Sequence, residues 1–512
     1  MKGKPFLGPQ CWTCRNRRVR CSSERPSCAV CRKRGLECLG YSEAKPVKWR
    51  PIALPCSQPL ALPGPSHSPG RQDDVCSPSV ALDIIYYCRD IGAAYVIEEM
   101  LSPAEWLECA FAQRHIFICL ASLHRILQTL PPNCSTLESI PLDALDKPSR
   151  SALVMFSQHQ ADAVRIVQEQ LESSSATEPD HALFSGLIGL LMSHIQQGAF
   201  GMWSAHLQGA KALLDRWGPA SYTALAEEEL FILITVDIYH TTTTASRQLP
   251  AQTWDHHSGY LRKIKQFSSG AIHSLAPVPV ELLTAVLLIN MRRILSRDSH
   301  VPQHQGAQPY HGTAPTVLQL IHSFSPTKWL EMVMPDRHNE ARGDDATDTL
   351  VVQSLSQQQW QGSWLSLAQC FQSATTLYLY LTKGPADQLD LSTEAMIQQR
   401  AESYTTLTES IAHLFTLRLE NPAASRHHKF ILWPMVIAGV EAVVTHRDDC
   451  QVNYICAYLR LLAYELGTLT MRQAALFLED LAGEYRRRGP EYVYRDHDDW
   501  DEIFRYSAIF LL

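Results

Sequence analysis

Six cysteines between Cys11 and Cys38 constrain this chain more than any other feature. They follow the spacing C-x2-C-x6-C-x6-C-x2-C-x6-C, which contains two copies of one eleven-residue unit, CWTCRNRRVRC and CAVCRKRGLEC. Each copy begins with a C-x2-C pair, a spacing that usually binds metal in intracellular proteins. The repeat therefore predicts a small domain with pseudo-two-fold symmetry, to which each copy contributes three sulfurs.

The number of sulfurs limits how metal can be bound. Thiolates bind zinc in tetrahedral sets of four, so two ions would need eight ligand positions. Only six sulfurs are present, and two of them must bridge the ions. The symmetry of the repeat favours the first cysteine of each copy, Cys11 and Cys28, as the bridging pair. The other predicted zinc ligands are Cys14, Cys21, Cys31 and Cys38.

A disulfide framework is the main alternative for these cysteines, and it requires a secretory route. The first ten residues, MKGKPFLGPQ, contain no apolar signal segment, so we expect an intracellular chain with reduced thiols. The longest apolar stretch, Ile431–Val444, is too short to span a bilayer and contains Pro434 and Glu441. We therefore expect no membrane among the partners.

Charge divides the chain into two unlike parts. The first fifty residues carry thirteen Lys or Arg and three Asp or Glu, a net charge of +10. The whole chain has a net charge of −7, which leaves −17 for residues 51–512. A basic head on an acidic body is typical of a protein whose head binds a polyanion. Four arginines of the first cysteine copy are the candidate contacts: Arg15, Arg17, Arg18 and Arg20.

The cysteine segment resembles the DNA-binding domain of the fungal binuclear zinc-cluster (Zn2Cys6) transcription factors. It has that family's spacing and basic first helix, and Pro26 lies where the family usually has proline. The resemblance implies two zinc ions, a nuclear protein, and a helix that enters the major groove of double-stranded DNA at CGG-type triplets. Relatives most often have lysine at the last base-reading position, where this chain has Arg17-Arg18. Arginine can donate to guanine O6 and N7 bidentately.

Three regions follow from composition. Residues 1–50 form the predicted zinc-cluster domain, and residues 51–80, rich in Pro and Ser, form a linker that we expect to be extended and disordered. No apolar heptad run follows the cluster, so any homodimer must form through the large domain. Residues 81–512 are predicted to be all-helical, with loops near 297–315 and 335–348.

Helical periodicity is clearest around Trp203, where apolar residues recur at Leu207, Ala210, Leu214 and Trp217. We expect Lys211, Asp215 and Arg216 to occupy the opposite face of this helix, and Gly218-Pro219 to end it. Further helices are predicted along Trp360–Phe371 and Ile397–Leu414. Near the C-terminus, Thr470 and Gln473 predict a T-x-x-Q capping box.

The segment QGAFGMWSAHLQGAKALLDRWG is similar to part of the helical regulatory domain of fungal zinc-cluster factors, in which a Trp precedes a His-Leu-x-Gly-Ala run. The matching residues are Trp203, His206, Leu207, Gly209 and Ala210. Such a domain implies regulation of the head by burial of the head, by a small-molecule effector, or by dimerisation. The sequence leaves these three alternatives open.

No catalytic constellation is present, because the chain lacks the metalloprotease, P-loop, nucleophile-elbow and dinucleotide-binding motifs. We therefore expect that the chain is not an enzyme. His256-His257 and His427-His428 are interpreted as surface or capping residues. Asp237 and His240 lie about one helical turn apart and could line an effector cavity, but a satisfied buried hydrogen bond is the favoured interpretation. The C-terminal RDHDDWDEIF, residues 495–504, fits either an acidic-aromatic activation segment or the exposed face of a last helix.

The sequence as a whole predicts a nuclear, DNA-binding regulator of RNA polymerase II transcription, with the transcription machinery as a further partner. Resemblance to regulators of fungal metabolism implies a role in a metabolic pathway or gene cluster. The alternative is a zinc-stabilised scaffold that recruits proteins and reads no DNA. The density of arginine in both cysteine copies favours DNA, since zinc modules that bind proteins tend to mix charges.

Overall fold

We analysed a computed structural model of the chain, which divides into two units, Met1–Pro69 and Gly70–Leu512. Each unit is described by itself. The structure describes residues 11, 14, 21–23, 28–34, 111–130, 145–174, 178–198, 200–250, 252–267, 278–297, 313–333, 349–383, 393–420, 430–489, 491–492, 494 and 497–505.

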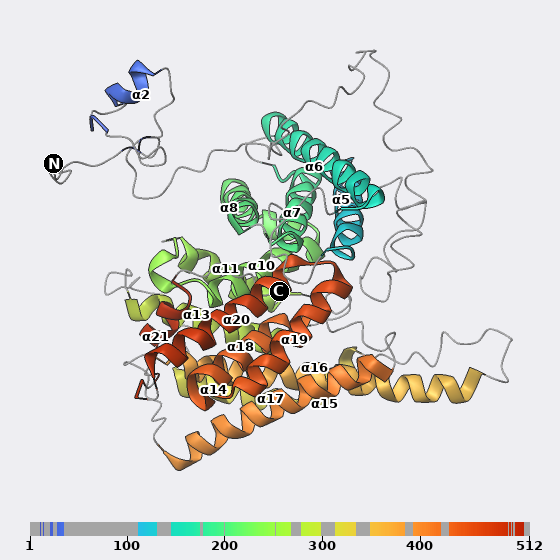
Figure 1. The fold of residues 1–512 in the computed structure, drawn as a ribbon, viewed down its shortest axis with the longest axis vertical. Coiled ribbons are helices and arrows are strands. Elements are labelled where there is room, and N and C mark those ends of the chain that lie inside the picture. Colours follow the sequence, from blue (N-terminus) through green and yellow to red (C-terminus); the bar gives the residue numbers. More distant parts are fainter. Residues whose placement is uncertain are drawn as a thin grey trace. The chain divides into compact units, whose positions relative to one another are not determined.

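Helices make up nearly all of the regular structure in these ranges, and no strand occurs there (Figure 1). The all-α prediction is therefore confirmed. The first unit contributes α2 (Ala29–Lys33). The second unit contains α5 (Phe111–Leu127), α6 (Lys147–Ser173), α7 (His181–Gln196), α8 (Phe200–Trp217), α9 (Ser221–Ala224), α10 (Glu227–Thr242), η4 (Ser246–Gln248), α11 (Thr253–Ile264), α13 (Val280–Arg297), α14 (Ala314–Ser323), α15 (Pro326–Val333), α16 (Thr349–Leu381), α17 (Glu394–Glu420), α18 (Leu432–Glu441), η7 (Ala442–His446), α19 (Asp449–Leu466), α20 (Leu469–Arg488) and α21 (His497–Ile503).

The first group of helices packs α5 against α6 and α7 against α8 (Figure 1). On α8 the predicted apolar stripe is buried from Trp203 to Trp217, and the helix ends at Gly218, whose φ of +75° suits glycine. Asp146 and Asp180 cap α6 and α7 by accepting hydrogen bonds from backbone N–H groups. The predicted apolar stripe and end of α8 are confirmed, whereas Lys211, which was predicted to lie on the opposite face, is buried.

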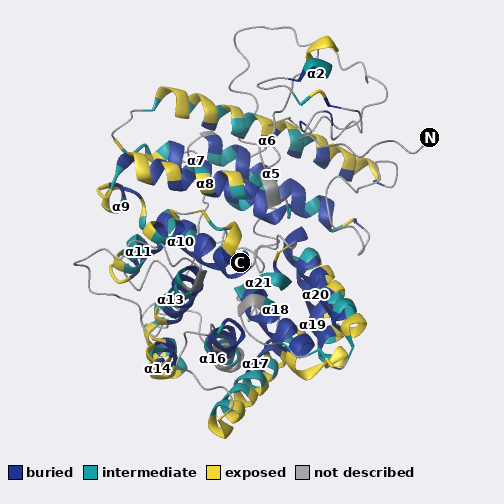
Figure 2. Cartoon of the chain, turned by 90° about the vertical axis from the view of Figure 1, so that its left-hand side faces the viewer, coloured by how far each residue is buried: buried dark blue, intermediate teal, exposed yellow. Residues whose placement is uncertain are grey.

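A second group of helices builds the larger core around α16 and α18. Every residue of α18 is buried, including Glu441, and α18 contacts α16, α17, α19 and α20. In Figure 2, the buried residues of α16 and α20 face this core, whereas α6 presents many exposed residues to solvent. Along α17 the predicted stripe is buried at Leu407, Ile411 and Leu414, but Ile397 is exposed.

The turn between α19 and α20 joins the two groups. Gly467 has a φ of +57° and lies against His124 of α5, while Gln196 of α7 donates to the Gly467 carbonyl at 2.9 Å. The predicted capping box is wrong, because Thr468 is the N-cap of α20. Thr470 instead donates to the Ile195 carbonyl. Gln473 likewise donates to the Gly198 carbonyl at 2.9 Å, so both predicted cap residues hold the two helix groups together.

Several predicted segments lie outside the described residues. They are the linker at 51–80, most of the loop at 297–315, and the whole loop at 335–348. The ends of the first loop are helical, since α13 continues to Arg297 and α14 begins at Ala314. Among the described helices, none is long and apolar enough to cross a bilayer.

Candidate metal centre

Five of the six N-terminal cysteines belong to the described residues, and their side chains meet in one buried cluster. Cys11, Cys14, Cys21, Cys28 and Cys31 are each at most 4% exposed. The four Sγ atoms of Cys11, Cys14, Cys21 and Cys28 all lie within 4.8 Å of one another. Cys38 lies outside the described residues. Two sequence-related units, seventeen residues apart, thus converge on one point.

The spacing of the sulfurs fits a tetrahedral metal. A zinc–sulfur bond of about 2.3 Å and a tetrahedral angle place ligand sulfurs about 3.8 Å apart. The Sγ of Cys11 lies 3.6 Å from that of Cys28 and 3.8 Å from that of Cys31. The Sγ of Cys14 lies 3.7 Å from that of Cys28 and 3.9 Å from that of Cys31. The cysteines present therefore fit the metal that their spacing predicts.

The two C-x2-C pairs have the same local geometry. The backbone N–H of Cys14 donates to the Sγ of Cys11 at 3.4 Å, and the N–H of Cys31 donates to the Sγ of Cys28 at 3.3 Å. In the second copy this bond makes Cys28 the N-cap of α2. A backbone donor stabilises negative charge on the sulfur that accepts it. Cys11 and Cys28 thus occupy equivalent positions, and the backbone donor at each sulfur favours its negatively charged thiolate form.

Burial alone favours the neutral thiols of this cluster. It raises the pKa of the Cys14 thiol to about 12, and it also raises the pKa of Cys31. A divalent cation binds thiolates and releases their protons, so metal binding would offset this cost. No other group of three or more potential ligands occurs in the part of the chain that the structure describes.

The arginines predicted to contact DNA, Arg15, Arg17, Arg18 and Arg20, lie outside the described residues. The second copy is described, and there Arg32, Lys33 and Arg34 are exposed at the end of α2. Among the described residues of the head, Val30 is the apolar side chain that packs against the cysteine cluster. The described part of the head therefore presents positive charge to solvent.

Asp237 of α10 is a satisfied buried group, as predicted. Its carboxylate accepts from Lys211 at 2.8–3.0 Å and from the Tyr260 hydroxyl at 3.0 Å. Burial alone would raise the pKa of Asp237, but the Lys211 ammonium outweighs this effect and lowers the pKa to about 2. Lys211 was predicted to lie on the solvated face of α8, and that prediction is wrong, because the residue is only 2% exposed. His240 instead forms an edge-on contact with the Trp203 ring.

The prediction that His256 and His257 lie at the surface is wrong. His257 is fully buried beside Asp237, and His256 is buried with its Nε2 2.9 Å from Asp215. Both belong to α11, which packs against α10 and α13. His427 and His428 lie outside the described residues.

Nine cysteines lie outside the N-terminal cluster. Of these, Cys119, Cys370 and Cys456 are buried, as is usual for free cysteines, whereas Cys450 is exposed. The remaining five lie outside the described residues: Cys56, Cys76, Cys88, Cys109 and Cys134.

Comparison with known proteins agrees with this geometry. Residues 10–48 match the model of the fungal Zn(2)-Cys(6) binuclear cluster domain, and residues 106–506 match that of the fungal specific transcription factor domain. The chain is 24% identical over 499 residues to the phomenoic acid biosynthesis cluster-specific transcriptional regulator of Leptosphaeria maculans, covering 92% of this chain and 85% of the relative. It is 39% identical over 61 residues to arginine metabolism regulation protein II of Saccharomyces cerevisiae, which covers 11% of this chain and 7% of that protein. No solved structure matches the chain.

Proposed function

Because the chain belongs to the fungal transcription factors with a Zn(2)-Cys(6) binuclear cluster, we propose that its N-terminal arginines read CGG-like triplets under control of the helical body. DNA-binding regulation of transcription is the activity of this family, and its cluster binds two zinc ions. The observation that carries the proposal is the set of Sγ distances of 3.6–3.9 Å in the described head.

The proposed ligands follow from the repeat. Cys11 and Cys28 would each bind both ions, because they are the equivalent sulfurs that accept the backbone N–H bonds at 3.4 and 3.3 Å. The terminal ligands would be Cys14, Cys21, Cys31 and Cys38. Zinc supplies positive charge that keeps the six sulfurs as thiolates and crosslinks a segment with almost no apolar core.

Base reading is proposed for the arginines that follow the first C-x2-C pair. Arg17 and Arg18 donate to guanine O6 and N7 in the major groove, where one guanidinium can bind both acceptors. Arg15 and Arg20 add to the positive surface that meets the phosphates. The exposed Arg32, Lys33 and Arg34 of the second copy extend that surface.

The helical body is proposed to regulate the head through an effector or a homodimer, and the chain is proposed to act in the nucleus without catalysing a reaction. The net charge of −17 over residues 51–512 supports a body that stays off DNA and contacts other proteins of the transcription machinery. A relative that aligns with most of this chain is a biosynthesis cluster-specific transcriptional regulator. We therefore propose that the targets form a metabolic gene cluster.

Selection from randomised duplex oligonucleotides with the full-length protein tests this proposal. We expect enrichment of CGG-like triplets, and we expect Arg18→Ala to relax preference at one base pair with a loss of about 1–3 kcal/mol. Arg165→Ala, which removes an exposed arginine of α6, is the matched control and should leave the motif unchanged.

Two results would contradict the base-reading assignment or the DNA-binding function itself. An unchanged motif with Arg18→Ala would remove Arg18 from base reading. Absence of any enriched motif, together with binding that does not weaken between about 50 and 200 mM salt, would instead indicate a scaffold that recruits proteins.

A further inference from the structure

The acidic-aromatic segment at the C-terminus is neither free nor an exposed helix face. Trp500 of α21 is 0% exposed, and Phe504, the residue after the end of this helix, is 1% exposed. The groups that receive it come from distant parts of the body, namely α10, η4, α13, α16 and α20. A helix of seven residues is too short to be stable alone, so its form depends on this contact.

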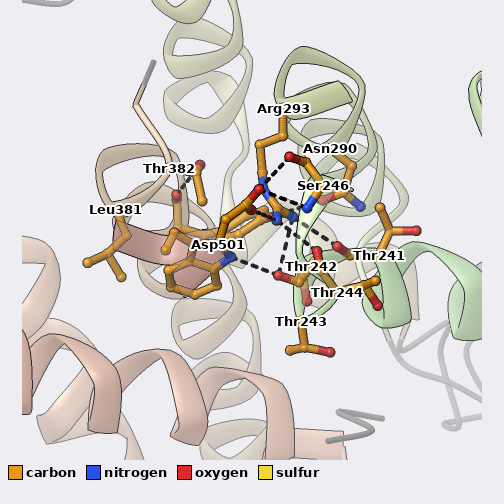
Figure 3. Close-up of polar contacts among 12 residues, drawn as sticks. Thr241, Thr242, Thr243, Thr244, Ser246, Asn290, Arg293, Leu381, Thr382 and Asp501 are labelled. Carbon is orange, nitrogen blue, oxygen red and sulfur yellow. Dashed lines mark hydrogen bonds and ion pairs between the residues drawn. The ribbon is translucent and has the colours of Figure 1, made fainter. Parts of the chain in front are cut away.

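The polar centre of the contact is an ion pair between Arg293 and Asp501 (Figure 3). Arg293 Nη2 lies 2.7 Å from Asp501 Oδ1. The second carboxylate oxygen accepts from the backbone N–H of Ser246 at 2.8 Å and from the Ser246 hydroxyl. Both carboxylate oxygens of Asp501 therefore accept hydrogen bonds, one from the charged guanidinium and the other from a backbone N–H and a hydroxyl. Such a set of donors favours a carboxylate at this position.

Arg293 is held in place by neutral groups as well. Its Nη1 donates to the Thr241 carbonyl at 2.8 Å and to the Tyr378 hydroxyl at 3.0 Å, and its Nη2 donates to the Thr244 carbonyl at 2.9 Å. These acceptors belong to the body and not to α21. They fix the guanidinium whether or not Asp501 is bound, so the receiving site is preorganised.

Aromatic contacts flank the ion pair. The Trp500 Nε1 donates to the Thr242 carbonyl at 2.9 Å, and its ring lies 5.3 Å from that of Tyr378. The Phe504 ring lies 5.2 Å from Phe477 of α20 and 4.8 Å from Trp500. The Phe504 N–H donates to the Trp500 carbonyl at 3.3 Å, so the helical turn continues to Phe504 and both rings lie on the same face, toward the body.

We propose that the helical body contains a peptide-docking site for a short acidic helix of the form Trp-Asp-x-x-Phe, and that the chain's own α21 is its occupant. The charge pair and the two buried aromatic anchors correspond to helix-in-groove recognition. Glu502, on the same helix, pairs instead with Arg505 at 2.8 Å and remains partly exposed. The segment that resembles an activation motif is therefore masked in this state. The proposal concerns the body alone and does not depend on DNA reading.

Hydrogen exchange on the full-length protein tests whether α21 can leave the body. We expect Asp501→Asn to speed exchange at 497–505 by at least tenfold, while α16 and α18 remain protected. Glu502→Gln removes the same charge from α21 outside the site and should behave as wild type. Ser246→Ala removes one donor to Asp501 without touching Arg293, and we expect a smaller increase in the same segment.

A labelled synthetic peptide of residues 495–506 tests whether the vacated site binds a ligand. It should bind the Asp501→Asn chain at least ten times more tightly than wild type, whose site is filled. Peptides carrying Trp500→Ala or Asp501→Asn should not bind. Equal binding to both chains, or no binding to the variant, would overturn the proposal. Loss of protection throughout α10, α16 and α18 in both Asp501→Asn and Ser246→Ala would also overturn it, since α21 would then be an inseparable part of the core.

Discussion

The ammonium of Lys211 lies 2.8 Å from a carboxylate oxygen of Asp237, and the two side chains are only 3% and 2% exposed. They join α8, which carries the Trp-x-x-His-Leu-x-Gly-Ala run, to α10 in the centre of the body. A buried ion pair is costly to break, because removal of one partner leaves an uncompensated charge. This pair fixes how α8 sits on α10.

Loss of either partner should destabilise the body strongly. We expect Lys211→Met and Asp237→Asn each to lower the free energy of unfolding by about 3–5 kcal/mol, and the double variant to lose clearly less than the sum. Denaturant titration measures these values. Glu169→Gln, which breaks the exposed pair with Arg165, is the control and should cost under about 1 kcal/mol. Additive losses at Lys211 and Asp237 would show that the two charges are not coupled.

The body should lose stability as pH falls below about 6.5, and His257 should contribute to that loss. Burial lowers the pKa of His257 to about 3, although the Asp237 carboxylate partly opposes the shift. The unfolded chain, in which the pKa is about 6.5, takes up the proton first, so acid favours unfolding from about pH 6.5 down toward pH 3. Each pH unit in that window costs up to about 1.4 kcal/mol for this residue.

Denaturation of wild type and His257→Gln at pH 7.5, 6.5 and 5.5 measures the contribution of His257. The variant should lose less stability than wild type between pH 6.5 and 5.5. His181→Gln, an exposed residue of α7, should keep the wild-type slope. Parallel pH curves for wild type and His257→Gln would rule out this role for His257.

Gly467 should tolerate substitution much less well than Gly218, although both have positive φ. A Cβ at Gly467 would lie 2.7 Å from the His124 Cα, whereas a Cβ at Gly218 would meet nothing within 4 Å. We expect Gly218→Ala to cost about 1–2 kcal/mol from backbone strain alone. Gly467→Ala should cost about 1–3 kcal/mol more, because the two helix groups must move apart. Thermal unfolding compares the two, and equal losses would argue against a tight contact at the α19–α20 turn.

Periodicity was sufficient to predict which face of a helix is buried where apolar residues recur regularly. The stripe from Trp203 to Trp217 is an example, because spacing along one helix decides which side chains share a face. Lys211 was placed wrongly, because a charged residue between apolar ones is usually solvated. Its partner Asp237 lies on another helix, and no sequence spacing predicts that contact.

Contacts between segments that are distant in the sequence account for the other differences between the sequence predictions and the structure. Thr470 and Gln473 have the spacing of a capping box, but acceptors at Ile195 and Gly198 bind them instead. Arg293 carries no motif at all, and its role follows only from the fold that brings Asp501 to it, 208 residues along the chain. The cysteine cluster could be predicted because six residues at fixed spacing form one local unit.

Removal of a proposed bridging cysteine should disrupt the head more than removal of a proposed terminal ligand. Cys11→Ser should eliminate both metal sites, because the Cys11 Sγ lies within 3.6 Å of Cys28 and 3.8 Å of Cys31 and would serve both ions. Cys14→Ser is the matched control from the same C-x2-C pair and should spare one site. Cys11→Ser should abolish DNA binding, and added zinc should not restore it while the body remains folded.

Elemental analysis of the purified full-length protein tests the central claim most directly. We predict about two zinc ions per wild-type chain, about one in Cys14→Ser and almost none in Cys11→Ser, with loss of DNA binding when a chelator removes the metal. A wild-type chain that holds no zinc, or that binds DNA equally well after chelation, would contradict the account.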